Sequence, residues 1–181
     1  MSEKNPWKVT HCKQVYENPW LALEHNEVIN PAGNPGIYGV VRFKTRAVGI
    51  LPIDEQGYTW LVGQYRFAVD QYHWELPMGG APLSETPLAC AQRELKEETG
   101  LEAQQWQLLQ RLHLSNSVTD EEGFLYVATE LQLGQAQPEE TEQLQLQRLP
   151  ASEALEWVFE GKITDAMTVT ALQSARLKGL I

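Results

Sequence analysis

The sequence predicts an α+β fold in which a mixed β-sheet core carries few helices, and three observations indicate it. Short runs rich in Val, Ile and Tyr, separated by turn signals, dominate the first third of the chain. Helical periodicity occurs only near the middle of the chain and at its carboxyl end. The composition, 43% hydrophobic and 21% charged over 181 residues, suits a compact chain with a real core.

An antiparallel β extension is predicted at the amino end. Its strands are separated by Asn30-Pro31 and by Gly33-Asn34-Pro35-Gly36, both of which are turn signals. The pattern of a β-meander ends near Phe43. We therefore expect an extension at 1–43 and a second domain at 44–181.

Two further strands are predicted at 46–53 and 59–65. They flank Asp54-Glu55-Gln56-Gly57, where Gly57 sits at the position at which a hairpin loop favours positive φ. We expect a short extended segment at 73–76 to follow them.

The next expected elements are a glycine-rich turn at Gly79 and a helix at 86–99. Leu88, Ala91 and Leu95 recur at helical spacing, and Gly100 is placed to end the helix. The remaining expected elements are strands at 106–113, 124–131 and 143–149 and helices at 151–160 and 165–178.

Charge and hydropathy exclude several classes of function. Fourteen Lys and Arg against 24 Asp and Glu give a net charge of −10, so most of the surface would repel a nucleic acid. Apolar stretches fall far short of the ~20 residues that span a bilayer. The amino terminus is polar, so a cytoplasmic location and no membrane are expected. An anionic small-molecule ligand would need a divalent cation between it and the protein.

One helix face supplies groups for such a cation. Glu94, Glu97 and Glu98 are separated by three and four residues, so their carboxylates share a face. Clustered carboxylate oxygens are ligands that Mg²⁺ accepts, and the glycine-rich turn allows a close backbone approach. Taken alone, this charged run is more typical of a solvated helix face.

The spacing decides between these interpretations. From Gly79 to Leu101 the chain matches G-x5-E-x7-R-E-U-x-E-E-x-G-U at every fixed position, where U is a bulky apolar residue. A chance match at one start has odds on the order of 1 in 10⁸. This pattern is the Nudix box, and the chain resembles the Nudix hydrolase family. The resemblance implies an α/β/α Nudix sandwich with the helix between a mixed sheet and a smaller sheet.

The resemblance also implies roles for the residues of the box. Glu94 and Glu98 would bind the metal directly, and Glu85 and Glu97 would support them directly or through water. Arg93 would orient a helix carboxylate. The expected cofactor is Mg²⁺, for which Mn²⁺ can substitute; it would polarise a diphosphate and activate water, while a carboxylate takes the proton.

The segments before the box resemble the ADP-ribose pyrophosphatase and nucleoside diphosphate sugar hydrolase branch. Gln64-Tyr65-Arg66 and Trp74-Glu75-Leu76-Pro77 carry this resemblance. It implies that Arg66 meets the diphosphate, with Glu75 among the substrate-binding residues, and that the carbonyl of Met78 binds metal. A surface ion pair is the alternative for Arg66.

Other segments supply further candidates. In the acidic run Glu139-Glu140-Thr141-Glu142, the resemblance makes Glu142 a metal ligand and Glu140 the general base, with Glu97 as the alternative base. Trp20 is a candidate for stacking on a base, and Glu121 for contacting metal or substrate. Solvated turns are the alternatives for both acidic segments. The branch further implies a domain-swapped homodimer in which the extension at 1–43 is the dimerisation element.

The expected reaction converts a nucleoside diphosphate sugar and water into a nucleoside monophosphate and a sugar phosphate. Asn116 stands where many ADP-ribose-cleaving relatives have proline, so GDP-mannose and ADP-glucose stay candidates beside ADP-ribose. Two alternatives are a hydrolase that removes unwanted nucleoside triphosphates and a non-catalytic Nudix-fold nucleotide sensor. The complete set of box glutamates favours catalysis.

Overall fold

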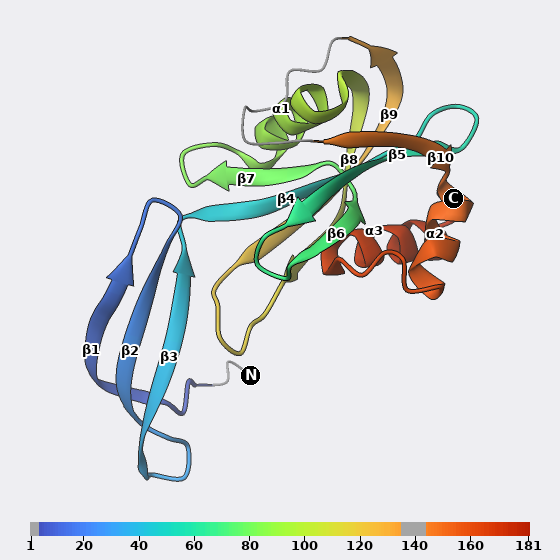
Figure 1. The fold of residues 1–181 in the computed structure, drawn as a ribbon. Coiled ribbons are helices and arrows are strands. Elements are labelled where there is room, and N and C mark those ends of the chain that lie inside the picture. Colours follow the sequence, from blue (N-terminus) through green and yellow to red (C-terminus); the bar gives the residue numbers. More distant parts are fainter. Residues whose placement is uncertain (1–3, 135–143) are drawn as a thin grey trace. The chain divides into compact units, whose positions relative to one another are not determined.

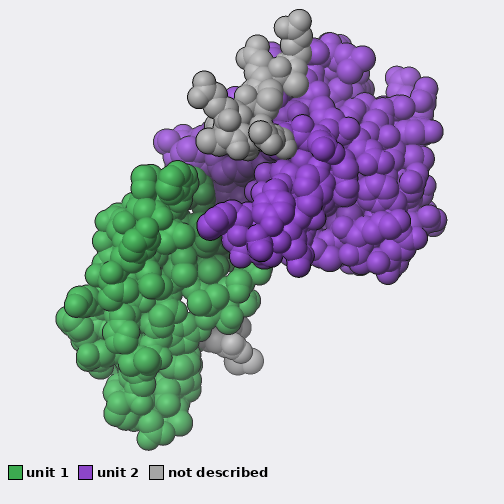
Figure 2. Space-filling model, in the orientation of Figure 1, with its two compact units in different colours: residues 1–45, 113–121 green, residues 46–112, 122–181 purple. Residues whose placement is uncertain are grey.

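The computed structural model describes residues 4–134 and 144–181 (Figure 1). These residues fall into two compact units, coloured separately in Figure 2. One unit contains the chain up to Thr45 together with His113–Glu121, and the other contains Arg46–Leu112 and Glu122–Ile181. None of the helices in the described ranges has the length and apolar character that crossing a membrane requires.

The first unit is built on an antiparallel sheet, as the turn signals predict. Its strands, in the order β1-β2-β3, are β1 (Lys8–Glu17), β2 (Leu21–Ile29) and β3 (Pro35–Phe43). The segment 113–121 joins this sheet, which the sequence did not indicate. The Val41 amide donates to the Val118 carbonyl at 2.9 Å, and the Tyr38 hydroxyl donates to the Ser117 carbonyl at 2.6 Å.

The second unit holds two sheets and three helices. The four-stranded sheet has the order β7-β4-β9-β8, with β4 and β9 parallel. The three-stranded sheet has the antiparallel order β10-β5-β6. Their strands are β4 (Thr45–Pro52), β5 (Tyr58–Arg66), β6 (Gln71–Glu75), β7 (Met78–Pro82), β8 (Leu101–His113), β9 (Glu122–Leu133) and β10 (Gln145–Pro150). The helices are α1 (Pro87–Thr99), α2 (Ala151–Phe159) and α3 (Ala166–Leu177).

Local sequence explains the bounds of α1, which agree with the predicted helix. The Thr86 side chain accepts a hydrogen bond from the Ala89 amide, and Pro87 occupies the first turn, where its missing N–H costs nothing. Gly100 ends the helix in the left-handed region with φ 72°. A fully buried cluster then joins α1 to the four-stranded sheet through Leu95 and Ala91 on the helix and Ile50 on β4.

Two expectations about strands were wrong. The segment expected as a glycine-rich turn at Gly79 is the edge strand β7, because β4 offers it a free edge. The strands on either side of 54–57 do not form a hairpin; β4 and β5 lie in different sheets. Gly57 nevertheless has φ 78°, as its position predicts. Its carbonyl accepts from the Ala151 amide at 2.9 Å, which ties the turn to α2.

Candidate active site

Arg93 gathers the acidic side chains of α1 and of the turn before it. Its guanidinium lies 3.2 Å from Glu85, 2.7 Å from Glu94 and 2.9 Å from Glu97. Burial lowers the pKa of Arg93, but the hydrogen bonds and charges of these carboxylates outweigh it and raise that pKa. The cation therefore offsets the mutual repulsion of carboxylates that share a helix face.

Glu94 lies against the backbone of β7. A Cβ added at Gly79 would stand 2.0 Å from the Glu94 carboxyl carbon, so only glycine leaves room for this carboxylate. The Glu94 side chain is 13% exposed. One helical turn earlier, the buried Cys90 sulfur lies 3.9 Å from a Glu94 oxygen. Burial, with the charge of Glu94, raises the pKa of Cys90 to about 12, so this thiol stays protonated.

Glu98 is buried at the junction of α1 and β7. It is 3% exposed and accepts a hydrogen bond from the Met78 amide at 2.9 Å. The neighbouring backbone is fixed from two other elements: the Leu76 amide donates to Thr168 Oγ1 on α3 at 3.0 Å, and the Pro77 carbonyl accepts from the Ile50 amide at 2.9 Å. The segment that carries the Met78 carbonyl is thus held by α1, α3 and β4.

Arg66 and Glu75 form a two-point ion pair across the β5–β6 hairpin. Arg66 Nε lies 3.1 and 3.0 Å from the two Glu75 oxygens, and a terminal nitrogen lies 2.5 Å from one of them. Burial lowers the pKa of Arg66, but the hydrogen bonds and charge of Glu75 outweigh burial, so the net pKa is raised. The charges of Asp165 and Glu98 add to this rise. Glu75 is buried, whereas the Arg66 side chain is 40% exposed and available to an anion.

Four further residues were predicted for the site: Trp20, Glu121, Glu140 and Glu142. Trp20 belongs to the unit of β1–β3 and is 68% exposed, with its amide bonded to Asn18 Oδ1 at 2.9 Å. Glu121 belongs to the same unit, and burial, followed by the charge of Asp120, raises its pKa. Glu140 and Glu142 lie outside the described residues. Their predicted roles stay predictions.

The donor set fits a divalent cation. Glu85, Glu94, Glu97 and Glu98 supply only carboxylate oxygens, and the Met78 carbonyl belongs to the segment that Glu98 holds. Hard oxygen ligands of this kind suit Mg²⁺ and related ions. Within 4–134 and 144–181 no three potential ligands converge as a metal-binding group. Arg93 explains this arrangement in part, because it draws three of the carboxylates toward its own charge.

Sequence reasoning missed the roles of two residues at the start of α3, the cap Asp165 and Thr168. Asp165 caps the helix by accepting from the Thr168 amide and hydroxyl, both at 2.8 Å, and Thr168 in turn accepts from Leu76. Asp165 is the first residue of the helix predicted at 165–178, and an Asp at that place is a recognisable cap signal. Nothing in the local pattern indicated that Thr168 would contact a segment 92 residues away.

A family model described as a NUDIX domain matches residues 43–167. The chain belongs to the Nudix family. This match contains α1 and the carboxylates around Arg93, so the expected Nudix fold and the box from Gly79 to Leu101 are confirmed together. A second model, described as the N-terminal domain of a nucleoside diphosphate sugar hydrolase, matches residues 7–41, which contain β1 and β2 and most of β3.

Two relatives match most of the length of this Nudix chain. It is 32% identical over 173 residues to the methanol dehydrogenase activator of Bacillus methanolicus, covering 94% of this chain and 93% of the relative. It is 32% identical over 155 residues to the ADP-ribose pyrophosphatase of Mycobacterium tuberculosis, covering 84% and 74%. A crystal structure of an ADP compounds hydrolase, 23% identical, superposes with a TM-score of 0.87 and covers 99% and 98% of the two chains.

Proposed function

We propose that this chain hydrolyses the diphosphate bond of nucleoside diphosphate sugars, with ADP-ribose, ADP-glucose and GDP-mannose as candidate substrates and Mg²⁺ as cofactor. The complete set of box carboxylates carries this proposal: Glu85, Glu94 and Glu97 around Arg93, and Glu98 against the Met78 amide. The match of residues 7–41 to the N-terminal domain of a nucleoside diphosphate sugar hydrolase supports the substrate class. The names of the pyrophosphatase relatives from Mycobacterium tuberculosis and Bacillus subtilis support it as well.

In this proposal each group has a separate task. Glu94 and Glu98, aided by Glu85, Glu97, Glu142 and the Met78 carbonyl, would hold the divalent cation. That cation would neutralise diphosphate oxygens and make water acidic enough to react near neutral pH. Arg66, fixed by Glu75, binds a diphosphate oxygen through its exposed face. Glu140 accepts the proton from water, with Glu97 as the alternative base.

Turnover of ADP-ribose tests the function directly. The products should be AMP and ribose 5-phosphate, formed only with Mg²⁺ or Mn²⁺ and lost on chelation. The Glu98→Gln variant should lose about two orders of magnitude or more in kcat, because a charged oxygen ligand is replaced by a neutral amide. Faster release of pyrophosphate from nucleoside triphosphates would instead favour the triphosphate hydrolase. Binding without turnover would favour the sensor.

The base is identified by comparing two variants. Glu140→Gln should slow kcat while leaving KM for ADP-ribose nearly unchanged, because a base acts on the proton and not on substrate binding. If Glu140→Gln retains full activity and Glu97→Gln abolishes it, the base lies on α1.

We further propose a homodimer formed through the sheet of β1–β3. All ten residues of β1 are exposed, and large apolar side chains stand exposed on this sheet. Exposed apolar patches of this kind mark association surfaces. A cytoplasmic location is proposed on separate grounds. Cys12 is free and exposed, which suits a reducing compartment; detection of the protein in a cytosolic fraction tests this.

A further inference from the structure

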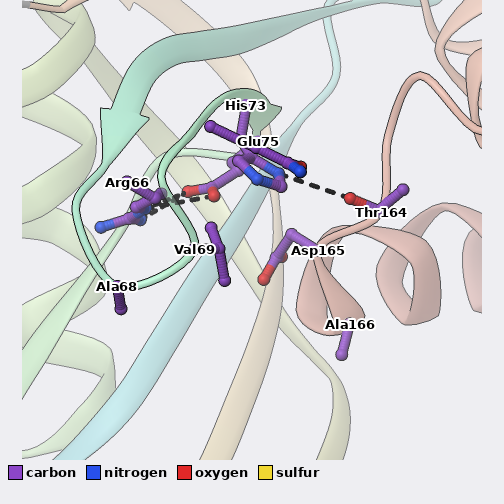
Figure 3. A pocket seen from close by; sticks show the side chains of 9 residues that line it. Arg66, Ala68, Val69, His73, Glu75, Thr164, Asp165 and Ala166 are labelled. Atoms are coloured by element: carbon purple, nitrogen blue, oxygen red, sulfur yellow. Dashed lines mark hydrogen bonds and ion pairs between the residues drawn. The ribbon is translucent and has the colours of Figure 1, made fainter.

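A cavity of about 730 Å³ adjoins the Arg66–Glu75 ion pair within the second unit (Figure 3). Ligand pockets commonly have volumes of roughly 300–1,000 Å³. The β5–β6 hairpin forms one wall, and the start of α3 with the residue pair before it forms another. The proposed function uses only Arg66 and Glu75 of its lining residues, so the rest of the cavity has no assigned role.

Arg66 connects this cavity to the carboxylates of α1. The charges of both Glu98 and Asp165 act on its guanidinium, so Arg66 lies within electrostatic range of the Nudix helix and of α3. Figure 3 shows the Arg66 and Glu75 side chains pointing toward each other, with Asp165 on another side of the pocket. A diphosphate bound between the carboxylate-held cation and Arg66 would therefore place one of its two substituents at the cavity.

The walls favour a hydroxyl-rich substituent over a nucleobase. Polar side chains that can exchange hydrogen bonds with hydroxyl groups come from Gln71, Thr164 and Asp165. Among the described lining residues the one aromatic ring is His73, whose Nδ1 lies 3.4 Å from Thr164 Oγ1. Nucleobases are commonly held by stacking on exposed aromatic faces, and this cavity presents no Trp, Tyr or Phe in the described part of its wall.

We propose that this cavity binds the sugar of the nucleoside diphosphate sugar, with Gln71 and Asp165 as specificity-determining residues. The proposal rests on the proposed function. Asp165 uses one carboxylate oxygen, Oδ2, to cap α3, which leaves Oδ1 to accept from a sugar hydroxyl. Gln71 is an exposed residue of β6, and its amide can both donate and accept.

Two substrates that differ only in the sugar test the proposal. ADP-ribose is compared with the methyl ester of ADP, which keeps the adenosine and the diphosphate but replaces the sugar by a methyl group. The measured quantity is the ratio of kcat/KM for ADP-ribose to kcat/KM for the ester. Gln71→Ala should lower this ratio about 3- to 10-fold, as expected for loss of a hydrogen bond between neutral groups.

Asp165→Asn should lower the ratio roughly tenfold or more, because a charged acceptor is lost. Asparagine is also a good helix cap, so α3 should stay folded, which circular dichroism and thermal unfolding would verify. The matched control is Gln107→Ala, an exposed glutamine on β8 outside the cavity, and it should leave the ratio unchanged.

The remaining outcomes overturn the proposal in distinguishable ways. An unchanged ratio in both variants would show that the sugar binds elsewhere. If the variants instead alter discrimination between the methyl esters of ADP and GDP, the cavity holds the base. If the wild-type protein cleaves neither ADP-sugars nor their methyl ester with Mg²⁺ present, the proposed function fails and the sugar pocket fails with it.

Discussion

At the scale of single residues, position 79 has the tightest steric requirement in the candidate site. The Glu94 carboxylate occupies the space that a Cβ would fill, with 2.0 Å between the two carbons. Gly79→Ala must therefore displace Glu94, a predicted metal ligand. We expect kcat/KM for ADP-ribose to fall by about two orders of magnitude and the Mg²⁺ concentration for half-maximal activity to rise.

A second glycine supplies the control for this substitution. A Cβ added at Gly39 on β3 would meet no atom within 4 Å, and the backbone there has an ordinary φ. Gly39→Ala should therefore preserve activity and its Mg²⁺ dependence. Wild-type kinetics in Gly79→Ala would show that the position of Glu94 is not critical for the reaction.

The sequence predicted the acidic face of the helix because helical spacing alone places Glu94, Glu97 and Glu98 together. It did not predict that Arg93 would bridge three carboxylates, one of them Glu85 from the preceding turn. It also did not show that Glu75 would be the buried partner of Arg66. Such contacts depend on how strands and turns fold back on one another, which residue periodicity does not encode.

At the scale of elements, Asp54 organises the turn between β4 and β5. Its Oδ1 accepts from the Gln56 and Tyr58 amides, both at 2.9 Å, while Oδ2 pairs with Arg148 on β10. Burial raises the pKa of Asp54, but the hydrogen bonds from Arg148 and the two amides outweigh burial and lower the pKa below its usual range. The ion pair thus ties the turn between β4 and β5 to β10 of the three-stranded sheet.

The sign of this shift predicts how stability depends on pH. A carboxyl group with a lowered folded-state pKa stabilises the fold above its unfolded pKa and loses that contribution as the pH falls through the folded value. Asp54→Asn should therefore lower the free energy of unfolding at pH 7 by about 1 kcal/mol, chiefly through lost charge-assisted hydrogen bonds. Much of Arg148 is solvated, so the ion pair itself contributes little.

Urea unfolding at pH 7 and near pH 3 measures this effect. The difference between the Asp54→Asn variant and the wild type should shrink at the lower pH, because the stabilisation from a lowered pKa is lost as the pH falls toward the folded-state value. Glu55→Gln changes the same charge at an exposed neighbour and should have little effect at either pH. A difference that is the same at both pH values would contradict the assignment to charge.

The contact between α3 and the strand segment before the Nudix box gives another prediction for elements. Thr168 is fully buried and accepts from the Leu76 amide, which is also buried. Thr168→Val keeps the shape but leaves that amide without its partner, at a cost of about 1–3 kcal/mol. Thr168→Ser retains the hydroxyl and should lose only the contribution of a methyl group, about 0.8 kcal/mol.

Thermal or urea unfolding compares the stability of the two variants. ADP-ribose kinetics show whether the segment also positions the site. Thr168→Val should lower kcat more than Thr168→Ser, because Leu76 lies two residues before the Met78 carbonyl. Equal stability of the two variants would mean that the hydroxyl does not hold this segment.

Among the elements, those with strong local signals were predicted well. The helix at 86–99 had a cap, a regular apolar spacing and a terminating glycine, and it forms within one residue of those bounds. The strand β7 was missed because Gly79 and Gly80 carry no side chains to pack, and what stabilises this segment as a strand is the free edge of β4. Likewise, positive φ at Gly57 is a local property, whereas the sheet that each flanking strand joins is not.

At the scale of the whole molecule, the alternation of short strands with few helices was sufficient to predict the fold class, and the box pattern added the Nudix fold. The grouping of distant segments was not predictable in the same way. Residues 113–121 belong with the amino-terminal sheet through hydrogen bonds such as that from the Val41 amide to the Val118 carbonyl. That bond joins two backbone groups, and the Tyr38 hydroxyl reaches a carbonyl 79 residues away, so no local pattern of side chains marks the grouping.

The proposed homodimer leads to the prediction for the whole molecule. Within the described residues β1 pairs with β2 only, and its outer edge offers unpaired backbone groups. Apolar side chains add exposed area on the same sheet, with Ile37 73% and Val9 61% exposed. Sedimentation should therefore give a mass twice that of the 20.5 kDa chain.

A charge placed on this sheet should oppose association. Ile37→Lys should shift the equilibrium toward monomer, because burying an unpaired ammonium in an interface is costly. Phe159→Lys makes the same change at a similarly exposed residue of α2, 74% exposed, and should leave the mass unchanged. If Ile37→Lys stays dimeric and Phe159→Lys dissociates, the interface lies on the second unit, because only the surface that is buried between the two copies can respond to an added charge.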